Sequence, residues 1–471
     1  MFNMNIPNLK EAKKRTNKTV ESKNYEKKYQ NIVENKKYFL KTYGCQMNEH
    51  DSENMKAILE EMGFTETTNM EEADLILLNT CSIRENAHNK VFGMLGRAKH
   101  LKSTKKDLIV GIAGCMSQEE VVAEKIMKKY KWMDFVLGTH NIELLGELVS
   151  NSLKKHELKI EAPSCEGDII EGLPAKRESK IKAYVNIMYG CDKFCTYCIV
   201  PYTRGKQRSR QPADIINEVQ QLVKDGYKEV TLLGQNVNAY GKDLEIEYNL
   251  KNLLTEVAET NIPRIRFITS HPWDFTDDMI DTISKYENIM PSIHLPVQSG
   301  NNEILKLMGR RYTKEEYLTL FNKIKEKIPN VSITTDIIVG FPNETRKQFE
   351  DTLDLVNKCK FDLAFTFIFS KRVGTPAEKM QDTITLEEKE QRLQELNELI
   401  NKYALENNQK LLNKTVDVLV EAKSEKNNML MGYTDTNKLV NLKGPENILG
   451  KIVKVKITDA KTWSLDGEYI K

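Results

Sequence analysis

The chain has 471 residues, of which 40% are hydrophobic, and its formal net charge is only +2. This length predicts two or three domains, and the near-neutral charge excludes a global basic field, so any binding of nucleic acid must depend on local patches. The sequence holds no apolar run of about 18 residues and no recognisable signal peptide, so we expect a cytoplasmic protein that does not cross a membrane.

Strand and helix patterns alternate in the N-terminal part of the chain. Residues 1–35 are rich in Lys, Glu and Asn and predict a polar tail. Over 36–154, candidate strands are separated by amphipathic segments, which is typical of a parallel sheet covered by helices. Pro and Gly residues then predict a linker over 155–178. The strands expected in this domain are Tyr38–Tyr43, Leu75–Asn79, Leu108–Ala113 and Phe135–Gly138.

A second alternating series occupies residues 179–407. Its six strand–helix units predict a partial (β/α)6 barrel, smaller than the eight-unit kind, with its chemistry at the C-terminal ends of the strands. A charged helix over 385–407 closes the series. The expected strands are Ala183–Tyr189, Glu229–Leu233, Ile265–Thr269, Ile293–Pro296, Ile333–Val339 and Leu363–Phe369.

The last region, 408–471, contains short β-branched segments separated by turn residues. Such a pattern predicts a small β-barrel. The fold class is therefore a multidomain α/β protein that ends in a β-barrel. The strands expected here are Val416–Glu421, Met429–Tyr433, Leu439–Leu442 and Ile452–Thr458.

Three cysteines directly follow the first strand of the central barrel. Cys191, Cys195 and Cys198 form a C-x3-C-x2-C motif, and a loop this short can wrap three thiolates around one [4Fe–4S] cluster while the fourth iron stays open. An electron carrier would normally bind all four irons through cysteine, so the incomplete set predicts that a small molecule binds the last one. Zinc is the main alternative, although structural zinc usually takes four protein ligands.

A second set, Cys45, Cys81 and Cys115, is related by its place in the fold. Each cysteine closes a predicted strand, and in a parallel sheet these strand ends share one edge. Because neighbouring strands lie roughly 5 Å apart, the three thiols can converge on a second cluster that again has an open iron. Chance burial of three cysteines is the alternative. Gly44 and Gly114 would let the backbone turn sharply there.

In a reducing cytosol, clustered cysteines are typical of metal ligands rather than of disulfides. Ordinary buried thiols are the alternative for the clustered six. Cys165, in the predicted linker, and Cys359, near a helix end, have no partner set, and we expect a plain structural role for both.

Polar residues at the ends of the barrel strands are candidates for a ligand pocket, with ordinary structural roles as the alternative. A basic segment after the cysteine loop is a candidate contact for RNA phosphates, with a solvated loop as the alternative. The pocket candidates are Gly234, Gln235, Asn236, His271, His294, Gln298 and Asp336. The basic segment contains Arg204, Lys206, Arg208 and Arg210.

These motifs resemble the methylthiotransferase branch of the radical S-adenosylmethionine (SAM) superfamily. The resemblance runs from about Lys36 to the C-terminus and implies an N-terminal iron–sulfur domain, a radical SAM core and a TRAM-like RNA-binding barrel. Tyr433 stands where the family leads us to expect Arg, so it would either stack on a base or pack in the barrel. The stretches that carry the resemblance include Lys41-Thr-Tyr-Gly-Cys-Gln-Met-Asn, Asn79-Thr-Cys-Ser-Ile-Arg-Glu-Asn-Ala, Gly114-Cys-Met-Ser-Gln, Leu233-Gly-Gln-Asn-Val-Asn and Thr335-Asp-Ile-Ile-Val-Gly-Phe-Pro.

The resemblance also implies the cofactors. SAM would chelate the open iron of the cluster held by Cys191, Cys195 and Cys198 and serve as radical source, and a second SAM would donate the methyl group. The cluster of the N-terminal domain would hold or deliver the sulfur. The seven pocket candidates would help to bind SAM.

Particular stretches are similar to one subfamily, the tRNA-2-methylthio-N(6)-dimethylallyladenosine synthases. This implies methylthio transfer to carbon 2 of N(6)-dimethylallyladenosine at tRNA position 37, with an electron donor such as flavodoxin or ferredoxin, a sulfur donor, and a monomeric enzyme. Sister branches that modify threonylcarbamoyl-adenosine or a ribosomal aspartate are the nearest alternatives. An iron–sulfur protein that binds RNA without catalysis is a more distant one.

Overall fold

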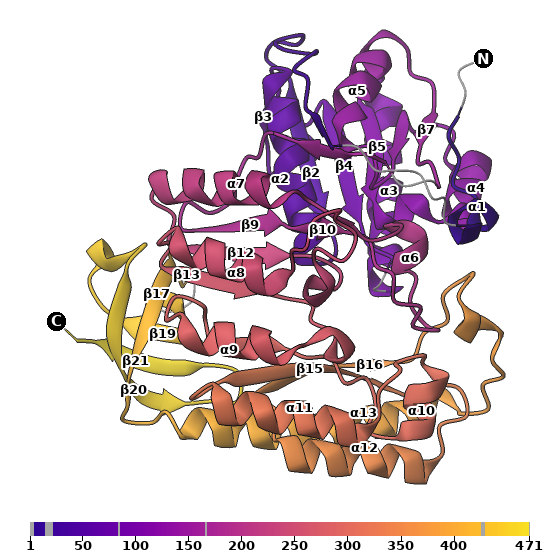
Figure 1. Ribbon diagram of the computed structural model, residues 1–471. Helices are drawn as coiled ribbons and strands as arrows, with labels where there is room; N and C mark the ends of the chain where they lie inside the picture. The colour runs from indigo at the N-terminus through magenta and orange to yellow at the C-terminus, as the bar shows by residue number, and fades with distance from the viewer. Residues whose placement is uncertain (1–3, 15–21, 83–84, 165–166, 425–428, 471) are drawn as a thin grey trace.

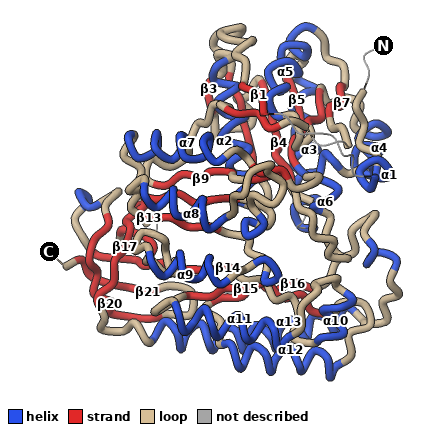
Figure 2. Tube along the Cα trace, in the orientation of Figure 1, coloured by secondary structure: helices blue, strands red, loops and turns tan. Residues whose placement is uncertain are grey.

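The computed structural model describes residues 4–14, 22–82, 85–164, 167–424 and 429–470 and arranges them in three units (Figure 1). The N-terminal sheet domain and the small C-terminal barrel both pack against the central β/α core. Figure 2 shows helices flanking the sheets of the first two units, whereas the last unit consists almost entirely of strands. Within the described ranges, no helix is long and apolar enough to span a membrane.

The N-terminal domain is built on a parallel sheet of six strands in the order β3-β2-β4-β5-β6-β7. The central strands β4 and β5 are buried along their whole length, as continuous apolar runs in a sheet covered on both faces should be. Helices α2 and α5 pack on one face, and α3 and α4 on the other. The four predicted strands are confirmed. The bounds are β2 Lys37–Thr42, β3 Thr65–Glu66, β4 Leu75–Thr80, β5 Ile109–Gly114, β6 Phe135–Leu137, β7 Lys159–Glu161, α2 Gln46–Glu61, α3 Glu85–Thr104, α4 Glu120–Lys129 and α5 Leu145–Lys154.

Parts of the predicted polar tail and of the predicted linker belong to this domain as short strands and a helix. The linker supplies β7, and β8 (Ile169–Glu171) pairs in parallel with β1 (Ser22–Asn24) from the tail. The tail also contains helix α1 (Leu9–Lys14). These elements are three to six residues long, too short to produce a hydrophobic pattern that a sequence can reveal. Cys165 lies outside the described residues.

The central core contains all six predicted strands, divided between two parallel sheets of three strands, β13-β12-β9 and β14-β15-β16. An isolated bridge between Ile265 and Ile289 joins the two halves. Cys359 is buried in the hydrophobic core of this unit, as expected for a structural thiol. The strands are β9 Lys182–Asn186, β10 Met188–Tyr189, β11 Arg208–Ser209, β12 Glu229–Leu233, β13 Arg264–Phe267, β14 Ser292–His294, β15 Ser332–Val339 and β16 Leu363–Ile368. The helices are α6 Val200–Thr203, α7 Pro212–Lys224, α8 Leu250–Glu259, α9 Asp277–Lys285, α10 Asn302–Leu307, α11 Lys314–Lys327, α12 Arg346–Cys359 and α13 Leu386–Gln409.

The C-terminal unit is a closed barrel of five strands in the order β17-β18-β19-β21-β20. The four predicted strands are confirmed, and the fifth, β21, escaped prediction because Asp466, Gly467 and Glu468 interrupt its apolar pattern. The bounds are β17 Thr415–Lys423, β18 Leu430–Thr434, β19 Leu439–Lys443, β20 Ile452–Ala460 and β21 Leu465–Tyr469.

Contacts with the starts of the core strands fix the position of this barrel. Lys182, at the start of β9, pairs with Glu421 at 2.6 Å, and Arg264, at the start of β13, donates to the carbonyl of Tyr433 at 2.9 Å. The ring of Tyr433 lies 5.4 Å from Lys182 Nζ, so Tyr433 packs against the core. The barrel therefore occupies the edge of the core opposite the C-terminal strand ends.

Candidate active site

The three N-terminal cysteines stand at the ends of three neighbouring strands. Cys45 follows β2 and precedes α2, Cys81 directly follows β4, and Cys115 directly follows β5. These strands are adjacent and parallel, so their C-terminal ends share one edge of the sheet. All three cysteines are free thiols, and Cys81 and Cys115 are buried while Cys45 is half-buried. The fold thus brings the three residues to the shared sheet edge that their positions after the predicted strands led us to expect.

Asn48, in the first turn of α2, connects these strand ends. Its Nδ2 donates to the carbonyls of Tyr43 and Thr80, at 3.0 and 2.8 Å. Its Oδ1 lies 3.9 Å from Cys45 Sγ and 3.8 Å from Cys115 Sγ. Asn48 therefore fixes the positions of two thiols relative to each other. The sequence reasoning missed this role, and the only signal for it is the place of Asn48 at the end of the first family-like stretch.

The surroundings of these thiols suit an iron–sulfur cluster. Burial raises the pKa of the Cys115 thiol to about 12, and nearby Cys81 adds to this effect while Arg204 opposes it. Cluster binding must therefore displace a proton from Cys115, whose thiol is neutral in the free chain. The hydroxyls of Ser82 and Ser117 are buried without a hydrogen-bond partner among the described residues, and such donors can bind cluster sulfides.

The second trio lies in the loop between β10 and β11. The two strands pair as a hairpin, and Cys191 N–H donates to the carbonyl of Gly205 at 3.1 Å. Cys198 N–H donates to the carbonyl of Cys195 at 3.0 Å, and Arg310 Nη1 donates to Cys195 Sγ at 3.4 Å. Burial raises the pKa of Cys191 to about 11 and also raises that of Cys198.

The six thiols are grouped in the structure, but their role as ligands stays a prediction. Among the described residues, no group of three or more His, Cys, Asp or Glu side chains is arranged to hold a metal ion. A four-iron cluster places its thiolates on different irons, so its ligands need not converge on one point.

The three residues that follow β12 indicate a site for a polar ligand. Gly234 and Asn236 are buried, and Gln235 Nε2 reaches Met47 Sδ of the N-terminal domain at 2.6 Å. Asn236 Oδ1 and Ser270 Oγ are buried without a hydrogen-bond partner in the described part of the chain. Because they follow the adjacent strands β12 and β13, these unsatisfied atoms fit a polar ligand such as SAM.

Asp274 is a buried carboxylate that sequence reasoning missed. It accepts hydrogen bonds from Asn236 Nδ2 at 2.7 Å, Lys193 Nζ at 3.0 Å and Lys242 Nζ at 2.6 Å. Burial alone would raise the pKa of Asp274, but these donors outweigh burial and hold the pKa below its usual range. Since Lys193 lies between Cys191 and Cys195, Asp274 anchors the cysteine loop to the strand-end pocket.

His294 and Asp336 face each other on the inner side of the second half-barrel. His294 Nε2 lies 3.3 Å from Asp336 Oδ2, and Thr334 Oγ1 lies 2.9 Å from His294 Nδ1. The ring of Phe365 meets the His294 ring edge-on at 5.9 Å. Phe365 and Phe367 are 48% and 42% exposed, so this inner surface combines a polar pair with two accessible aromatic rings. The opposite side of β15 packs on helices through Ile333, Ile337 and Val339.

His271 and Gln298 do not join this group. His271 Nδ1 accepts the N–H of Trp273 at 3.2 Å, and the His271 ring packs edge-on against Tyr312 at 5.9 Å. Burial lowers the pKa of His271 to about 2, so the imidazole is neutral. Gln298 has a positive φ of 73° and donates its N–H to the carbonyl of Asp336 at 2.9 Å. Both residues therefore have structural contacts, and their predicted roles in SAM binding stay predictions.

The basic segment after the cysteine loop faces inward, which corrects the expected RNA contact for three of its four cations. Arg204, Arg208 and Arg210 are each less than a tenth exposed, because acceptors from the N-terminal domain, the 155–178 segment and helix α7 of the core surround them. Lys206 is half-buried, and its contact with RNA stays a prediction. The acceptors are Asp51 for Arg204, the carbonyl of Gly167 for Arg208, and Glu171 and Glu218 for Arg210.

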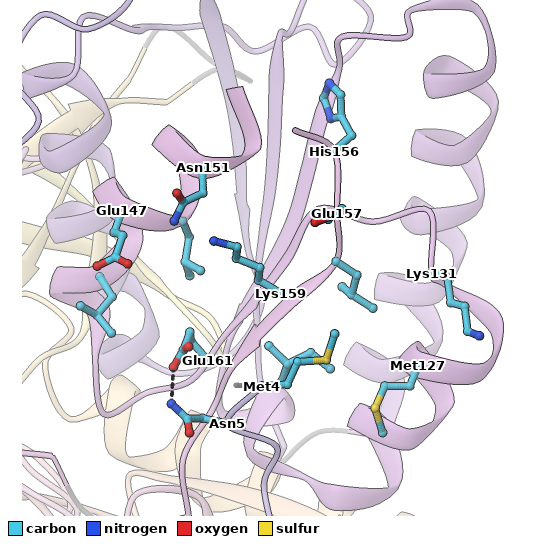
Figure 3. A pocket seen from close by; sticks show the side chains of 14 residues that line it. Met4, Asn5, Met127, Lys131, Glu147, Asn151, His156, Glu157, Lys159 and Glu161 are labelled. Carbon is cyan, nitrogen blue, oxygen red and sulfur yellow. Dashed lines mark hydrogen bonds between the residues drawn. The ribbon is translucent and has the colours of Figure 1, made fainter. Parts of the chain in front are cut away.

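A cavity of about 930 Å³ lies at the outer edge of the N-terminal sheet, beside β7 and α5 (Figure 3). It is lined by mixed charges such as Lys159, Glu147 and His156, and an Asn5–Glu161 hydrogen bond of 2.7 Å crosses its floor. None of the predicted site residues lines it. The candidate active site therefore lies at the strand ends that carry the cysteines and not in this cavity.

Comparison with known families agrees with this division of the chain. Residues 37–138 match a family described as uncharacterized protein family UPF0004, residues 185–356 match the radical SAM superfamily, and residues 409–470 match the TRAM domain. Among solved structures, the radical SAM methyltransferase TsrM from Kitasatospora setae shares the fold, with a TM-score of 0.52 and 13% identity over 73% of this chain and 77% of that one.

Curated relatives align along almost the whole chain. A protein of Staphylococcus epidermidis is 55% identical over 98% of this chain and 91% of its own length, and one of Bacillus pumilus is 56% identical over 98% and 92%. Both are named tRNA-2-methylthio-N(6)-dimethylallyladenosine synthase. With this identity over nearly its full length, and with matches to the radical SAM superfamily and the TRAM domain, the chain belongs to the tRNA-2-methylthio-N(6)-dimethylallyladenosine synthase family of radical SAM enzymes.

Proposed function

We propose that this protein adds a methylthio group to carbon 2 of N(6)-dimethylallyladenosine at tRNA position 37, using two [4Fe–4S] clusters. The observation that carries the proposal is the pair of cysteine trios on either side of one domain interface. One trio stands at the C-terminal strand ends of the N-terminal parallel sheet, and the other lies in the β10–β11 loop that follows strand β9 of the core. Three protein ligands leave one iron of each cluster open. One open iron suits SAM and the other suits the sulfur that is transferred. The names of the curated relatives support this reaction.

Cys191, Cys195 and Cys198 would hold a cluster, which would supply the electron for the radical reaction that defines the superfamily. The protein's own groups position the reactants around it. The buried polar atoms of Asn236 and Ser270 are available to SAM.

On the inner face of the second half-barrel, the His294–Asp336 pair and the exposed ring of Phe365 can hold the adenine and its apolar substituent. These residues would orient the base toward the cysteine loop and exclude water from it.

The position of the C-terminal barrel favours a large substrate. It lies at the start of the core strands and the cysteine loops lie at their ends, so roughly 15–20 Å separates the two edges. A small molecule cannot bridge this length, whereas an RNA stem and its loop can. In this proposal the barrel binds tRNA at a distance from the modified base, and an electron donor such as flavodoxin or ferredoxin and a separate sulfur donor complete the reaction.

Anaerobic reconstitution with iron and sulfide tests the proposal. The protein is incubated with dithionite, SAM and tRNA that carries the dimethylallyl group, and mass spectrometry of nucleosides looks for the added methylthio group. Triple alanine variants of each cysteine trio should each lose about half of the bound iron and all methylthio transfer. Cys359→Ala, which removes a buried thiol of the core, serves as the matched control and should keep both.

The products distinguish the proposed function from its alternatives. If the wild type forms deoxyadenosine but leaves this tRNA unchanged, the substrate belongs to a sister branch that acts on threonylcarbamoyl-adenosine or on a ribosomal aspartate. If fully iron-loaded protein forms no deoxyadenosine, the proposed reaction is wrong. If the variant without Cys45, Cys81 and Cys115 binds as much iron as the wild type, the second cluster is wrong.

A further inference from the structure

One side chain of the radical SAM core enters the cysteine site of the N-terminal domain. Arg204 lies six residues after Cys198 in the loop between β10 and β11. Its Nε donates to Cys115 Sγ at 3.1 Å, and its Nη2 donates to Asn48 Oδ1 at 2.9 Å and to Asp51 Oδ2 at 2.8 Å. Arg204 is 3% exposed. The guanidinium thus contacts three groups of the N-terminal domain, one of which is a predicted cluster ligand.

The backbone next to Arg204 holds the other cysteine set. The carbonyl of Gly205 accepts the N–H of Cys191 at 3.1 Å. The chain Cys191, Gly205, Arg204, Cys115 therefore links the two trios through two hydrogen bonds and one peptide bond. A displacement of the β10–β11 loop would move both Cys191 and the positive charge that faces Cys115.

The negative charge of a bound cluster would explain why the positively charged Arg204 is buried at this position. A [4Fe–4S]²⁺ core with three thiolates carries a net charge of about −1, and a buried anion is costly unless a cation or donors accompany it. Arg204 is the cation that directly contacts a sulfur atom of this trio in the described structure, and Asp51 neutralises part of its charge. The core trio has an analogous arrangement, because buried Arg310 donates to Cys195 Sγ at 3.4 Å. In the described part of the chain, a guanidinium therefore contacts a ligand sulfur in each of the two predicted cluster sites.

We propose that Arg204 is a positioning residue shared by the two cysteine sites, which sets the reduction potential of the N-terminal cluster and fixes that cluster relative to the radical SAM loop. The inference rests on the proposed second cluster. Hydrogen bonds to ligand sulfur and a nearby positive charge stabilise the reduced cluster, which carries one more negative charge, and so raise its reduction potential. Arg204 therefore keeps the N-terminal cluster at a higher potential than its cysteine ligands alone would give.

A full-length variant with Cys191→Ala, Cys195→Ala and Cys198→Ala isolates the N-terminal cluster for measurement. This protein is reconstituted with iron and sulfide and titrated anaerobically, and EPR spectroscopy follows the reduced cluster. Adding Arg204→Met should lower the midpoint potential and change the EPR spectrum, while Arg204→Lys, which keeps the charge without the planar donor set, should give a smaller decrease. Asp51→Asn should raise the midpoint, because it removes the anion that competes for Arg204.

Arg310→Met in the same background is the matched control, since it removes an equally buried arginine that faces the other trio, and it should leave the midpoint unchanged. Unchanged midpoints in both Arg204→Met and Asp51→Asn overturn the inference and leave the proposed function intact. If Arg204→Met binds no iron, Asp51→Asn decides alone: a higher midpoint supports the inference, and an unchanged one overturns it. If the parent variant itself binds no iron, the second cluster fails and the inference fails with it.

Discussion

Gly44 lies against Cys81 so closely that a Cβ atom on Gly44 would be 2.8 Å from Cys81 Cβ and 3.2 Å from Cys81 Sγ. The backbone of Gly44 also has a positive φ of 137°, a conformation that residues with a side chain rarely adopt. This glycine is therefore required for two independent reasons at the point where the strand ends of the N-terminal sheet meet.

Gly44→Ala should abolish the N-terminal cluster and spare the other one. Reconstituted protein is expected to bind about half of the wild-type iron, because the added methyl group displaces Cys81 while the β10–β11 loop is untouched. Gly93→Ala is the matched control: Gly93 has nothing within 4 Å of an added Cβ, and alanine is favoured within a helix by roughly 1 kcal/mol. Iron content equal to that of the wild type in Gly44→Ala would contradict the geometry of this site.

Hydrophobic pattern alone predicted most of the fold, because long apolar strands dominate it. The strands β4, β5, β12 and β15 coincide closely with their predicted ranges, since the first three are buried throughout, β15 is buried on its helix-facing side, and turn residues bound them. The elements that escaped prediction, such as β1 and β7, contain three residues each. Their pairing depends on the neighbours that a folded domain supplies rather than on their own sequence.

The cysteine trios were also predictable, whereas the charged residues around them were not. Cys45, Cys81 and Cys115 share a position relative to their strands, which sequence displays directly. Arg204 instead belonged to a run of cations that is typical of RNA contacts. Its burial results from the approach of Asp51, which lies 153 positions away in the chain. Long-range pairings of this kind leave no local signal.

The seam between the core and the C-terminal barrel depends on a buried ion pair. Arg266 Nε donates to Glu229 Oε2 at 3.0 Å, and its two other nitrogens donate to the carbonyls of Thr434 and Asp435 at 2.7 and 2.8 Å. Arg266→Met should destabilise the protein by about 3–5 kcal/mol, because it leaves Glu229 as an uncompensated buried charge. A lower unfolding temperature in calorimetry and faster proteolytic release of the barrel would show this.

A second substitution separates charge from packing at the same seam. Adding Glu229→Gln to Arg266→Met removes the unpaired carboxylate, so the double variant should regain part of the lost stability. If Arg266→Met unfolds at the wild-type temperature, or if the double variant is less stable than the single one, the pair does not hold the barrel in place.

The buried histidine of the strand-end pocket should make stability depend on pH in the acidic range. Burial lowers the pKa of His271 to about 2 in the folded protein, whereas an unfolded chain titrates near 6.5. The unfolded state therefore binds the additional proton, and stability falls as the pH drops below about 6.5, by up to about 1.4 kcal/mol per pH unit. His271→Asn keeps an acceptor for the Trp273 N–H and removes this titration. Urea unfolding between about pH 6.5 and pH 5 should give a shallower pH dependence for the variant, and parallel curves would contradict the assignment.

The exposed ring of Phe365 should contribute to recognition of the modified base in the proposed reaction. Phe365 is 48% exposed, and its ring lies beside His294 and Asp336. Stacking of an aromatic ring on a base is worth roughly 1–3 kcal/mol. Phe365→Ala should therefore lower kcat/KM for dimethylallyl tRNA by about 5- to 150-fold, mainly through KM, while Phe365→Tyr keeps the ring and most of the activity. Val121→Ala, at an exposed apolar position on α4, is the control for general surface effects. Equal loss in the alanine and tyrosine variants would mean that the ring does not contact the base, since only alanine removes the stacking face.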